Sequence, residues 1–290
     1  MKTINISWLL IILFTLFQEN TEAQVSIGKN SGLKTDTINK LILDKAKYQV
    51  YYNMIFSNDS LQPQIKTECQ TILLIGSQYN AFLDYNSLRK DSLYDALAIK
   101  KANIGEIVAT VLPIGKQIKF KPSIIKNYPV KGEYTFQEML LSREVYRYVD
   151  NNVDIKWTLG KESKMIKGYN CKNATCTYRG RQYTAWYTPD IPISEGPYVF
   201  SGLPGLIMEI SDTRQHYLFS INGFTTTGNH TPIYLSTDHI IESSRDQVRK
   251  AISNAKNDPA SIINSLGNAK IDPATLAKLK PKPYNPIELK

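Results

Sequence analysis

Four carboxylates are the residues of this sequence that could take part in acid–base chemistry: Asp190, Glu195, Glu209 and Asp212. Asp190 and Glu195 flank a proline in an expected loop, and functional residues often lie on loops. A carboxylate in a turn more commonly accepts hydrogen bonds from its own backbone. Glu209 alternates with apolar neighbours, so it should face solvent or a cavity. Since no partner residue marks an acid–base pair, we assign no catalytic residue.

The three histidines, His216, His230 and His239, do not stand at the spacing of helical metal ligands. The sequence also lacks the zinc-protease motif, the nucleophile elbow and the phosphate-binding loop. We therefore expect no metal and no cofactor, and we favour a protein without enzymatic activity. A peptide hydrolase that uses Asp190, Glu195 and a histidine is the third-ranked alternative.

Three cysteines occur, at Cys69, Cys171 and Cys176. Cys171 and Cys176 are five residues apart in one expected strand, which puts them on opposite faces and roughly 17 Å apart. A disulfide needs Cα atoms within about 7 Å. A bridge would therefore join Cys69 to one of the other two, and three unpaired thiols are an equally open outcome.

Tyrosine is the dominant aromatic residue, with 18 Tyr against 9 Phe and 3 Trp. Amphipathic rings suit a cleft for a sugar, peptide or lipid, and they suit half-buried strand faces as well. We select Trp186, Tyr187, Tyr198 and Leu203, which lie in or near the glycine- and proline-rich part of the chain, as candidates for ligand or partner binding.

The N-terminus has the pattern of a signal peptide. Lys2 precedes an apolar run over residues 6–17, and a polar stretch ends at Ala23, after which we expect cleavage. The run is shorter than the roughly 20 residues of a membrane span; the alternative is a buried N-terminal helix. Gln24 stands where a lipoprotein would have cysteine, so we expect no lipid anchor there. The protein should be exported to the periplasm or the outer-membrane periphery.

The chain has 290 residues and a net charge of +9. Removal of residues 1–23 leaves 267 residues (290 − 23) and a charge of +10, because the removed part carries Lys2, Glu19 and Glu22. A basic excess could favour anionic lipid, lipopolysaccharide or acidic ligands. The charges are scattered, however, and export argues against nucleic acid as a partner.

Alternating apolar residues predict a mainly β fold: an antiparallel, curved sheet or half-barrel packed by one or two helices. Helical periodicity predicts helices over 87–101, with Ser87 as N-cap, and over 103–110, ending before Pro113. The predicted strands cover residues 48–56, 66–75, 81–85, 117–120, 123–127, 134–136, 146–149, 165–178, 182–188, 206–211 and 216–221.

The C-terminal part differs, with predicted helices over 243–256, 259–266 and 273–279 and a frayed end near Pro281. We therefore divide the mature chain into a β domain over 24–235 and a helical extension over 236–290.

Residues 196–212 are the most distinctive stretch. Pro204 and Gly205 would occupy the centre of a type II turn over Leu203–Leu206, because proline fixes φ and glycine supplies a positive φ. The lysine and hydroxyl residues of a phosphate loop are missing. The pattern indicates a tight turn that leads into a core strand.

This stretch contains Gly202-Leu203-Pro204-Gly205-Leu206-Ile207, and the chain resembles the GLPGLI family of bacterial envelope proteins over about residues 45–225. The other shared residues are Gly168, Tyr169, Cys171, Ala174, Thr175, Gly180, Arg181, Ala185, Trp186, Tyr187, Asp190, Ile191, Pro192, Gly196 and Pro197. Cys176 is outside the pattern, so the resemblance favours Cys69–Cys171 as any disulfide. The resemblance implies export in bacteria with two membranes, with no established activity and with genes often near TonB-dependent receptors.

Three functions are compatible with these observations. The first is a non-enzymatic, exported accessory protein whose curved sheet binds a hydrophobic ligand, either lipid or peptide. The second is a module that docks on a TonB-dependent outer-membrane receptor through the glycine- and proline-rich loop. The third is the peptide hydrolase with an unfamiliar site.

Overall fold

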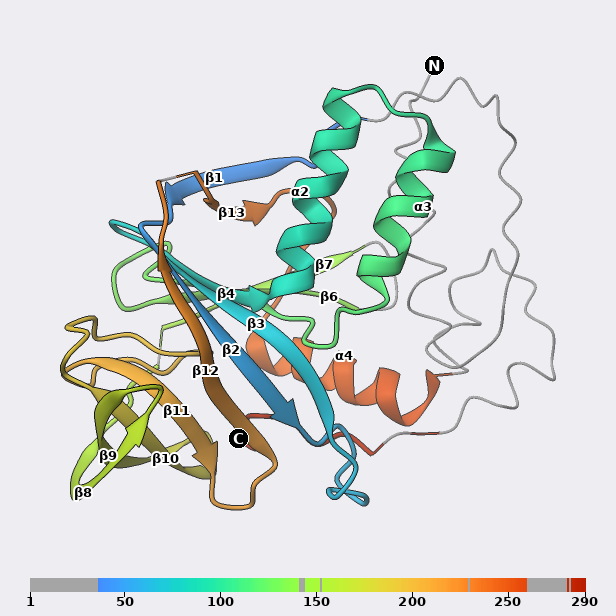
Figure 1. Ribbon diagram of the computed structural model, residues 1–290. Coiled ribbons are helices and arrows are strands. Elements are labelled where there is room, and N and C mark those ends of the chain that lie inside the picture. Colours follow the sequence, from blue (N-terminus) through green and yellow to red (C-terminus); the bar gives the residue numbers. More distant parts are fainter. Residues whose placement is uncertain (1–35, 141–143, 152, 229, 260–280, 282) are drawn as a thin grey trace.

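The computed structural model describes residues 36–140, 144–151, 153–228, 230–259, 281 and 283–290 (Figure 1). Within them the chain forms fourteen strands and three helices. The predicted signal peptide, the predicted helix over 273–279 and all but the first residue of the one over 259–266 lie outside this described part. The strands are β1 (Lys40–Lys45), β2 (Tyr48–Phe56), β3 (Thr67–Ile75), β4 (Asn80–Asp84), β5 (Ser123–Lys126), β6 (Tyr134–Met139), β7 (Val145–Asp150), β8 (Thr158–Ile166), β9 (Tyr169–Tyr178), β10 (Arg181–Thr188), β11 (Leu206–Asp212), β12 (Tyr217–Thr226), β13 (Pro232–Ser236) and β14 (Ile240–Glu242).

Twelve of these strands form one sheet in the order β14-β7-β6-β5-β4-β3-β2-β12-β11-β10-β9-β8. Strands β2 to β7 are one antiparallel meander and β8 to β12 a second, and the two are joined where β12 pairs with β2. Only β14 is parallel to its neighbour, β7. The sheet curves without closing into a barrel (Figure 1). This confirms the predicted class, a mainly β fold with a curved, largely antiparallel sheet packed by helices.

The helices are α2 (Tyr85–Ile99), α3 (Ile104–Gly115) and α4 (Arg245–Asn257). The α2 N-cap is Asp84 rather than Ser87, and its carboxylate accepts from the amide of Asn86 over 2.8 Å. The prediction that the second helix ends before Pro113 is wrong, because α3 continues through that residue. Its buried residues lie on both sides of the proline, and packing of that face outweighs the missing hydrogen bond.

The predicted single strand over 165–178 is in fact a hairpin. Lys167 and Gly168 have φ values of +51° and +86° and form the turn between β8 and β9. Positive φ at both central residues is the geometry of a tight hairpin turn. Strand β8 escaped prediction because nearly all of it is exposed, so it lacks alternation. Residues 117–120, predicted as a strand, form a loop.

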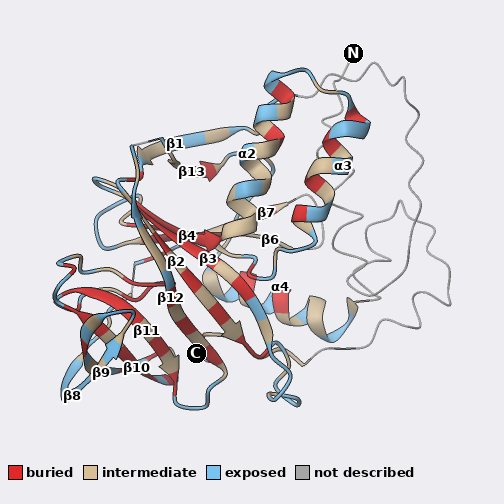
Figure 2. Ribbon diagram, viewed as in Figure 1, coloured by how far each residue is buried: buried red, intermediate tan, exposed pale blue. Residues whose placement is uncertain are grey.

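One face of the large sheet, here called the inner face, carries the main core. Along β2, buried residues alternate with less buried ones (Figure 2), and the buried set includes Val50, Tyr52 and Met54. The loop over 189–205 between β10 and β11 folds onto this face and adds Phe200 and Leu203 to the same cluster. The inner face is therefore filled largely by the chain itself.

The opposite face of β3, β4 and β5 carries a second, smaller core. It is built from residues such as Ile72, Leu74 and Leu83, with Ile233 and Leu235 from β13. Helix α2 and the two-stranded sheet of β1 and β13 supply residues to it (Figure 1). None of the helices in the described residues is long and apolar enough to cross a membrane.

Candidate functional site

The glycine- and proline-rich loop over 189–205, here called the signature loop, is closed by backbone hydrogen bonds where it leads into β11. The amide of Leu206 donates to Ile191 O over 3.0 Å, and that of Ile207 donates to Glu195 O over 3.0 Å. The expected type II turn over Leu203–Leu206 is therefore not formed. The amide of Gly205 instead donates to Leu203 O over 2.8 Å, which makes a three-residue turn centred on Pro204.

Gly205 is required by its surroundings. Its φ is +146°, and a Cβ at this position would lie 2.0 Å from the carbonyl oxygen of Thr188. Any other residue would have to displace the backbone of β10. Through Gly205, the hexapeptide over 202–207, here called the signature hexapeptide, fixes the loop against the sheet.

Glu195, one of the carboxylates considered for catalysis, belongs to a buried ion pair. Its carboxylate lies 2.9 Å from Lys126 Nζ and accepts from the Asn80 amide over 2.8 Å. Lys126 also donates to the carbonyl oxygens of Gly196 and Phe200 over 2.9 and 3.2 Å. Because all three bonds of the ammonium are used within the loop, this pair anchors the loop.

The four residues selected for ligand binding are divided by the structure. Tyr187 and Leu203 are core residues, exposed by only 3% and 1%, and they offer no surface to a partner. Trp186 is half-buried beneath the Lys164 ammonium, 4.5 Å from its ring centroid. The ring of Tyr198 is also buried, but its hydroxyl reaches a bound segment of the chain, as described below.

The three cysteines are buried free thiols in the described structure, so it contains no Cys69–Cys171 bridge. Cys171 and Cys176 were expected on opposite faces, yet both belong to the inner core. The alternation shifts within β9, since Cys171 and Ala174 are both buried although three residues apart. Burial raises the pKa of Cys176 to about 12, which keeps this thiol protonated.

The remaining acidic candidates are dispersed. Asp190 is exposed, and Glu209 pairs with Lys164 over 2.6 Å on the sheet surface. Among the residues that the structure describes, no three histidine, cysteine or acidic side chains are grouped so that they could hold a metal ion. Asp212 alone lies in a more elaborate site.

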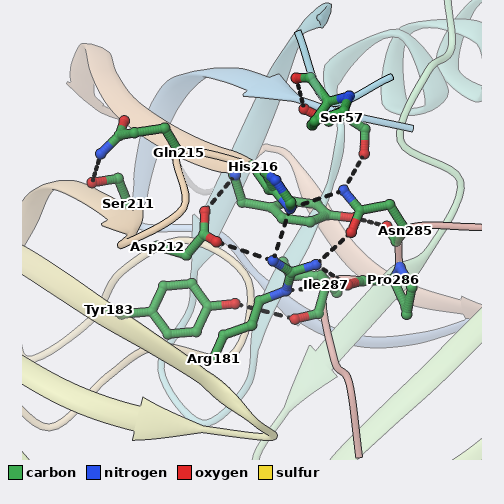
Figure 3. A network of polar contacts seen from close by, with 12 residues as sticks. Ser57, Arg181, Tyr183, Ser211, Asp212, Gln215, His216, Asn285, Pro286 and Ile287 are labelled. Carbon is green, nitrogen blue, oxygen red and sulfur yellow. Dashed lines mark hydrogen bonds and ion pairs between the residues drawn. The ribbon is translucent and has the colours of Figure 1, made fainter. Parts of the chain in front are cut away.

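That site is occupied by residues 283–290, which were expected to be frayed or helical. They form an extended segment that lies against β9, β10 and β12 (Figure 3). Its two buried residues are polar: Asn285 is 4% and Glu288 5% exposed, whereas the apolar Leu289 is 39% exposed. Apolar residues are normally the ones buried. The segment is therefore held chiefly by specific polar contacts, which we describe as two subsites.

The Asn285 subsite reads both ends of one amide group. Arg181 donates to Asn285 Oδ1 over 2.7 Å, and Asn285 Nδ2 donates to Ser57 O over 2.8 Å (Figure 3). Asn285 Nδ2 also lies 3.3 Å from His216 Nδ1. A carboxylate here would face the Ser57 carbonyl oxygen, so the subsite distinguishes an amide from an acid.

Arg181 is itself held in place by the sheet. Its guanidinium pairs with Asp212 over 3.0 Å, and the two side chains are 2% and 1% exposed. Asp212 also accepts from the amide of Tyr217 over 2.7 Å. His216 Nδ1 lies 3.4 Å from Arg181, and since Arg181 only donates, this nitrogen must accept. Burial lowers the pKa of His216, consistent with a neutral ring.

The Glu288 subsite surrounds one carboxylate with donors. Tyr198 and Tyr178 donate their hydroxyls to Glu288 Oε1 over 2.6 and 3.2 Å. Arg245 of α4 donates from Nε to Glu288 Oε2 over 2.8 Å. Burial, followed by the nearby Glu288 charge, raises the pKa of Tyr198 well above its usual value, so its hydroxyl stays a donor. Charge-assisted bonds of this kind are the stronger ones in proteins.

The main chain of the segment is also bound along its length. Side chains donate to four successive carbonyl oxygens: Tyr217 to Asn285 O, Arg181 to Pro286 O, Tyr183 to Ile287 O and Arg249 to Glu288 O, at 2.6, 2.6, 3.2 and 3.0 Å. The amide of Leu289 donates to Arg179 O over 2.7 Å. Such contacts hold any extended chain, whereas the two subsites select its side chains.

Little of this site could be found by sequence reasoning. Arg181 follows Gly180 among the residues of the family resemblance, and that was the only signal for it. Asn285, Glu288 and Arg245 carry no local pattern, because their side-chain partners within the two subsites are between 43 and 228 positions away. The assignment of this end to a frayed or helical extension concealed them.

One comparison with known proteins matches this part of the chain, and it assigns no activity. The family model of a protein of unknown function, Porph_ging, matches residues 177–209, which include β10 and the signature loop. This family is found in Bacteroidetes envelope proteins. No curated protein is significantly similar to the chain.

Two solved structures of PNGF-II, in the P21 and C2 space groups, share 16% identity with this chain, with TM-scores of 0.46 and 0.44. They cover 73% and 72% of this chain, which spans 34% and 33% of theirs, about a third of the longer protein. An uncharacterized conserved protein from Thermus thermophilus shares 6% identity at a TM-score of 0.33, over 68% of this chain and 90% of its own. These distant likenesses carry no information on function.

Proposed function

We propose that this chain is an exported, non-enzymatic accessory protein of the cell envelope, and that its curved sheet binds an extended polypeptide segment. The observation that carries the proposal is the binding of residues 283–290 through their main chain and two buried polar side chains. The signal-peptide pattern and the GLPGLI resemblance support export.

A peptide is favoured over a lipid because of what covers the inner face. Phe200 and Leu203 of the signature loop pack there with the strand residues, where an acyl chain would need space. The described residues do form an open depression of about 530 Å³, but it lies at β1, near Leu43, Asp44 and Ser77, and its lining is as polar as it is apolar.

The partner that supplies such a segment would be another envelope polypeptide. The resemblance makes TonB-dependent receptors and other outer-membrane components the first proteins to test. Docking through the tip of the signature loop has less support, because Leu203 is buried.

Two measurements test the proposal. Cell fractionation with mass analysis of the mature N-terminus should find the protein in the envelope fraction, cleaved after Ala23; an uncleaved cytoplasmic protein would contradict export. A photoreactive residue at Gln215, which is exposed next to His216 of the Asn285 subsite, should form adducts with polypeptide in living cells. The matched control is the same residue at Ile99, which is 73% exposed on α2. Equal adducts at both positions, or adducts with lipid only, would contradict peptide binding at this site.

A further inference from the structure

We infer that the site selects segments that carry an asparagine followed three positions later by a glutamate, and that residues 283–290 are an internal occupant which such a partner segment replaces. This inference rests on the proposed peptide-binding function and adds its specificity and regulation.

The site is held together without its occupant. Asp212 fixes Arg181 over 3.0 Å and is fixed in turn by the amide of Tyr217. Arg179 and Asp150 form a second ion pair at 2.8 Å beside the Glu288 subsite. None of these contacts involves the segment, and Arg245 also lies 3.9 Å from Asp150, so the donors stay near their positions when the segment leaves.

Apolar contacts anchor the segment only weakly. Of its residues, Ile287 packs against the inner core and is only half-buried, while Leu289 and Lys290 are exposed. Each hydrogen bond replaces a bond to water and adds about 0.5–1.5 kcal/mol, or about 1.5–3 kcal/mol to a charged group, whereas ordering the backbone of each residue costs about 1–2 kcal/mol. A segment held in this way can be exchanged for another that makes the same polar contacts.

The two subsites select different side-chain groups. Ser57 O needs a donor and Arg181 an acceptor, a combination that an amide supplies and a carboxylate does not. Two tyrosine hydroxyls and Arg245 converge on Glu288, which favours a carboxylate there. Between the two subsites, Pro286 is bound through its carbonyl oxygen, which accepts from Arg181, so the site needs no backbone N–H at this position.

The test uses the full chain with its own segment weakened, Asn285→Ala together with Glu288→Ala. The probe is a fluorescent synthetic peptide with the sequence of residues 283–290. We expect the double variant to bind this peptide at least about tenfold more tightly than the unchanged protein, in which the tethered segment competes. A full-chain Leu289→Ala variant is the matched control and should bind no better than the unchanged protein.

Peptide variants test the specificity. Changes equivalent to Asn285→Asp and Glu288→Gln should each weaken binding about tenfold or more. The first turns an oxygen towards the carbonyl oxygen of Ser57, and the second removes the charge that pairs with Arg245. The change equivalent to Leu289→Ala should alter binding by less than about threefold. Circular dichroism and thermal melting must show that the protein variant is folded; the single Asn285→Asp variant of the full chain replaces it if it is not.

The outcomes separate the inference from the proposed function. A folded variant that binds no peptide contradicts both. Binding that is indifferent to the asparagine and the glutamate overturns the inference and leaves peptide binding intact. Light scattering should show monomers, and a dimer formed by exchange of residues 283–290 between copies would overturn the assignment to a partner.

Discussion

Arg181 and Asn285 are 104 positions apart in the sequence, but Arg181 donates a hydrogen bond to the Asn285 side chain over 2.7 Å. Both residues are buried, with 3% and 4% of their surfaces exposed. Arg181 also carries the ion pair with Asp212, so one guanidinium links the sheet to the bound segment. The two residues connect the stability of the fold with the proposed binding of a peptide.

Replacement of Arg181 by alanine should lower the free energy of unfolding by about 3–5 kcal/mol, because it leaves the Asp212 carboxylate buried without its counter-ion. Urea denaturation measures this change. Arg214→Ala is the control, since Arg214 is exposed in the turn between β11 and β12, and its effect should stay within about 0.5 kcal/mol. Equal losses in the two variants would show that the ion pair contributes nothing.

Glu195→Gln should destabilise the protein by about 1.5–3 kcal/mol, the usual worth of a hydrogen bond to a charged group, because Lys126 is 1% exposed and loses its counter-ion. Asp190→Asn, at an exposed position of the same loop, should have almost no effect on the melting temperature. A Glu195→Gln protein of unchanged stability would argue that this carboxylate has a role other than anchoring the loop.

Gly205→Ala should destabilise by about 2 kcal/mol or more beyond Gly132→Ala. Both glycines have positive φ, but only Gly205 has a backbone oxygen where the Cβ would go, whereas Gly132 has no atom within 4 Å. Comparison of the two thermal melts therefore isolates the close contact with Thr188. Similar melting temperatures would mean that β10 moves aside freely.

Stability should decrease as the pH falls below about 6.5, the ordinary pKa of histidine, through the pKa of folded His216, which burial lowers. In this range His216 binds a proton in the unfolded chain but not in the folded chain, so unfolding becomes more favourable as the pH falls. The charged groups that face the ring are Asp212, Arg181, Lys66 and Arg214.

Urea titrations between pH 5 and pH 8 check this prediction. The His216→Gln variant should lose part of the pH dependence, and a variant at the exposed His230 should keep all of it. If both variants follow the unchanged protein, the interaction of His216 with Arg181 is not what couples stability to pH.

The fold class could be predicted because strands such as β2 alternate clearly between buried and partly buried residues. Prediction failed where burial does not follow alternation. Strand β8 is exposed along most of its length, and α3 is set by packing that overrides Pro113.

The site could not be predicted for a different reason. Its residues make side-chain contacts across 43 to 228 positions of the sequence, and Asn285 and Glu288 resemble ordinary surface residues. The signature hexapeptide was expected to form a turn that leads into a strand, and it does lead into β11, although its turn differs from the predicted type. The residues that bind the segment lie outside it.

The most direct test of peptide binding at this site is a crystal structure of the Asn285→Ala/Glu288→Ala protein with the peptide of residues 283–290. We expect density for the peptide with its asparagine against Arg181 and its glutamate between Tyr198 and Arg245, and we expect the tethered segment to be displaced. Density for the tethered segment still in place, with two alanines in the subsites and the peptide absent or bound elsewhere, would contradict peptide binding at this site.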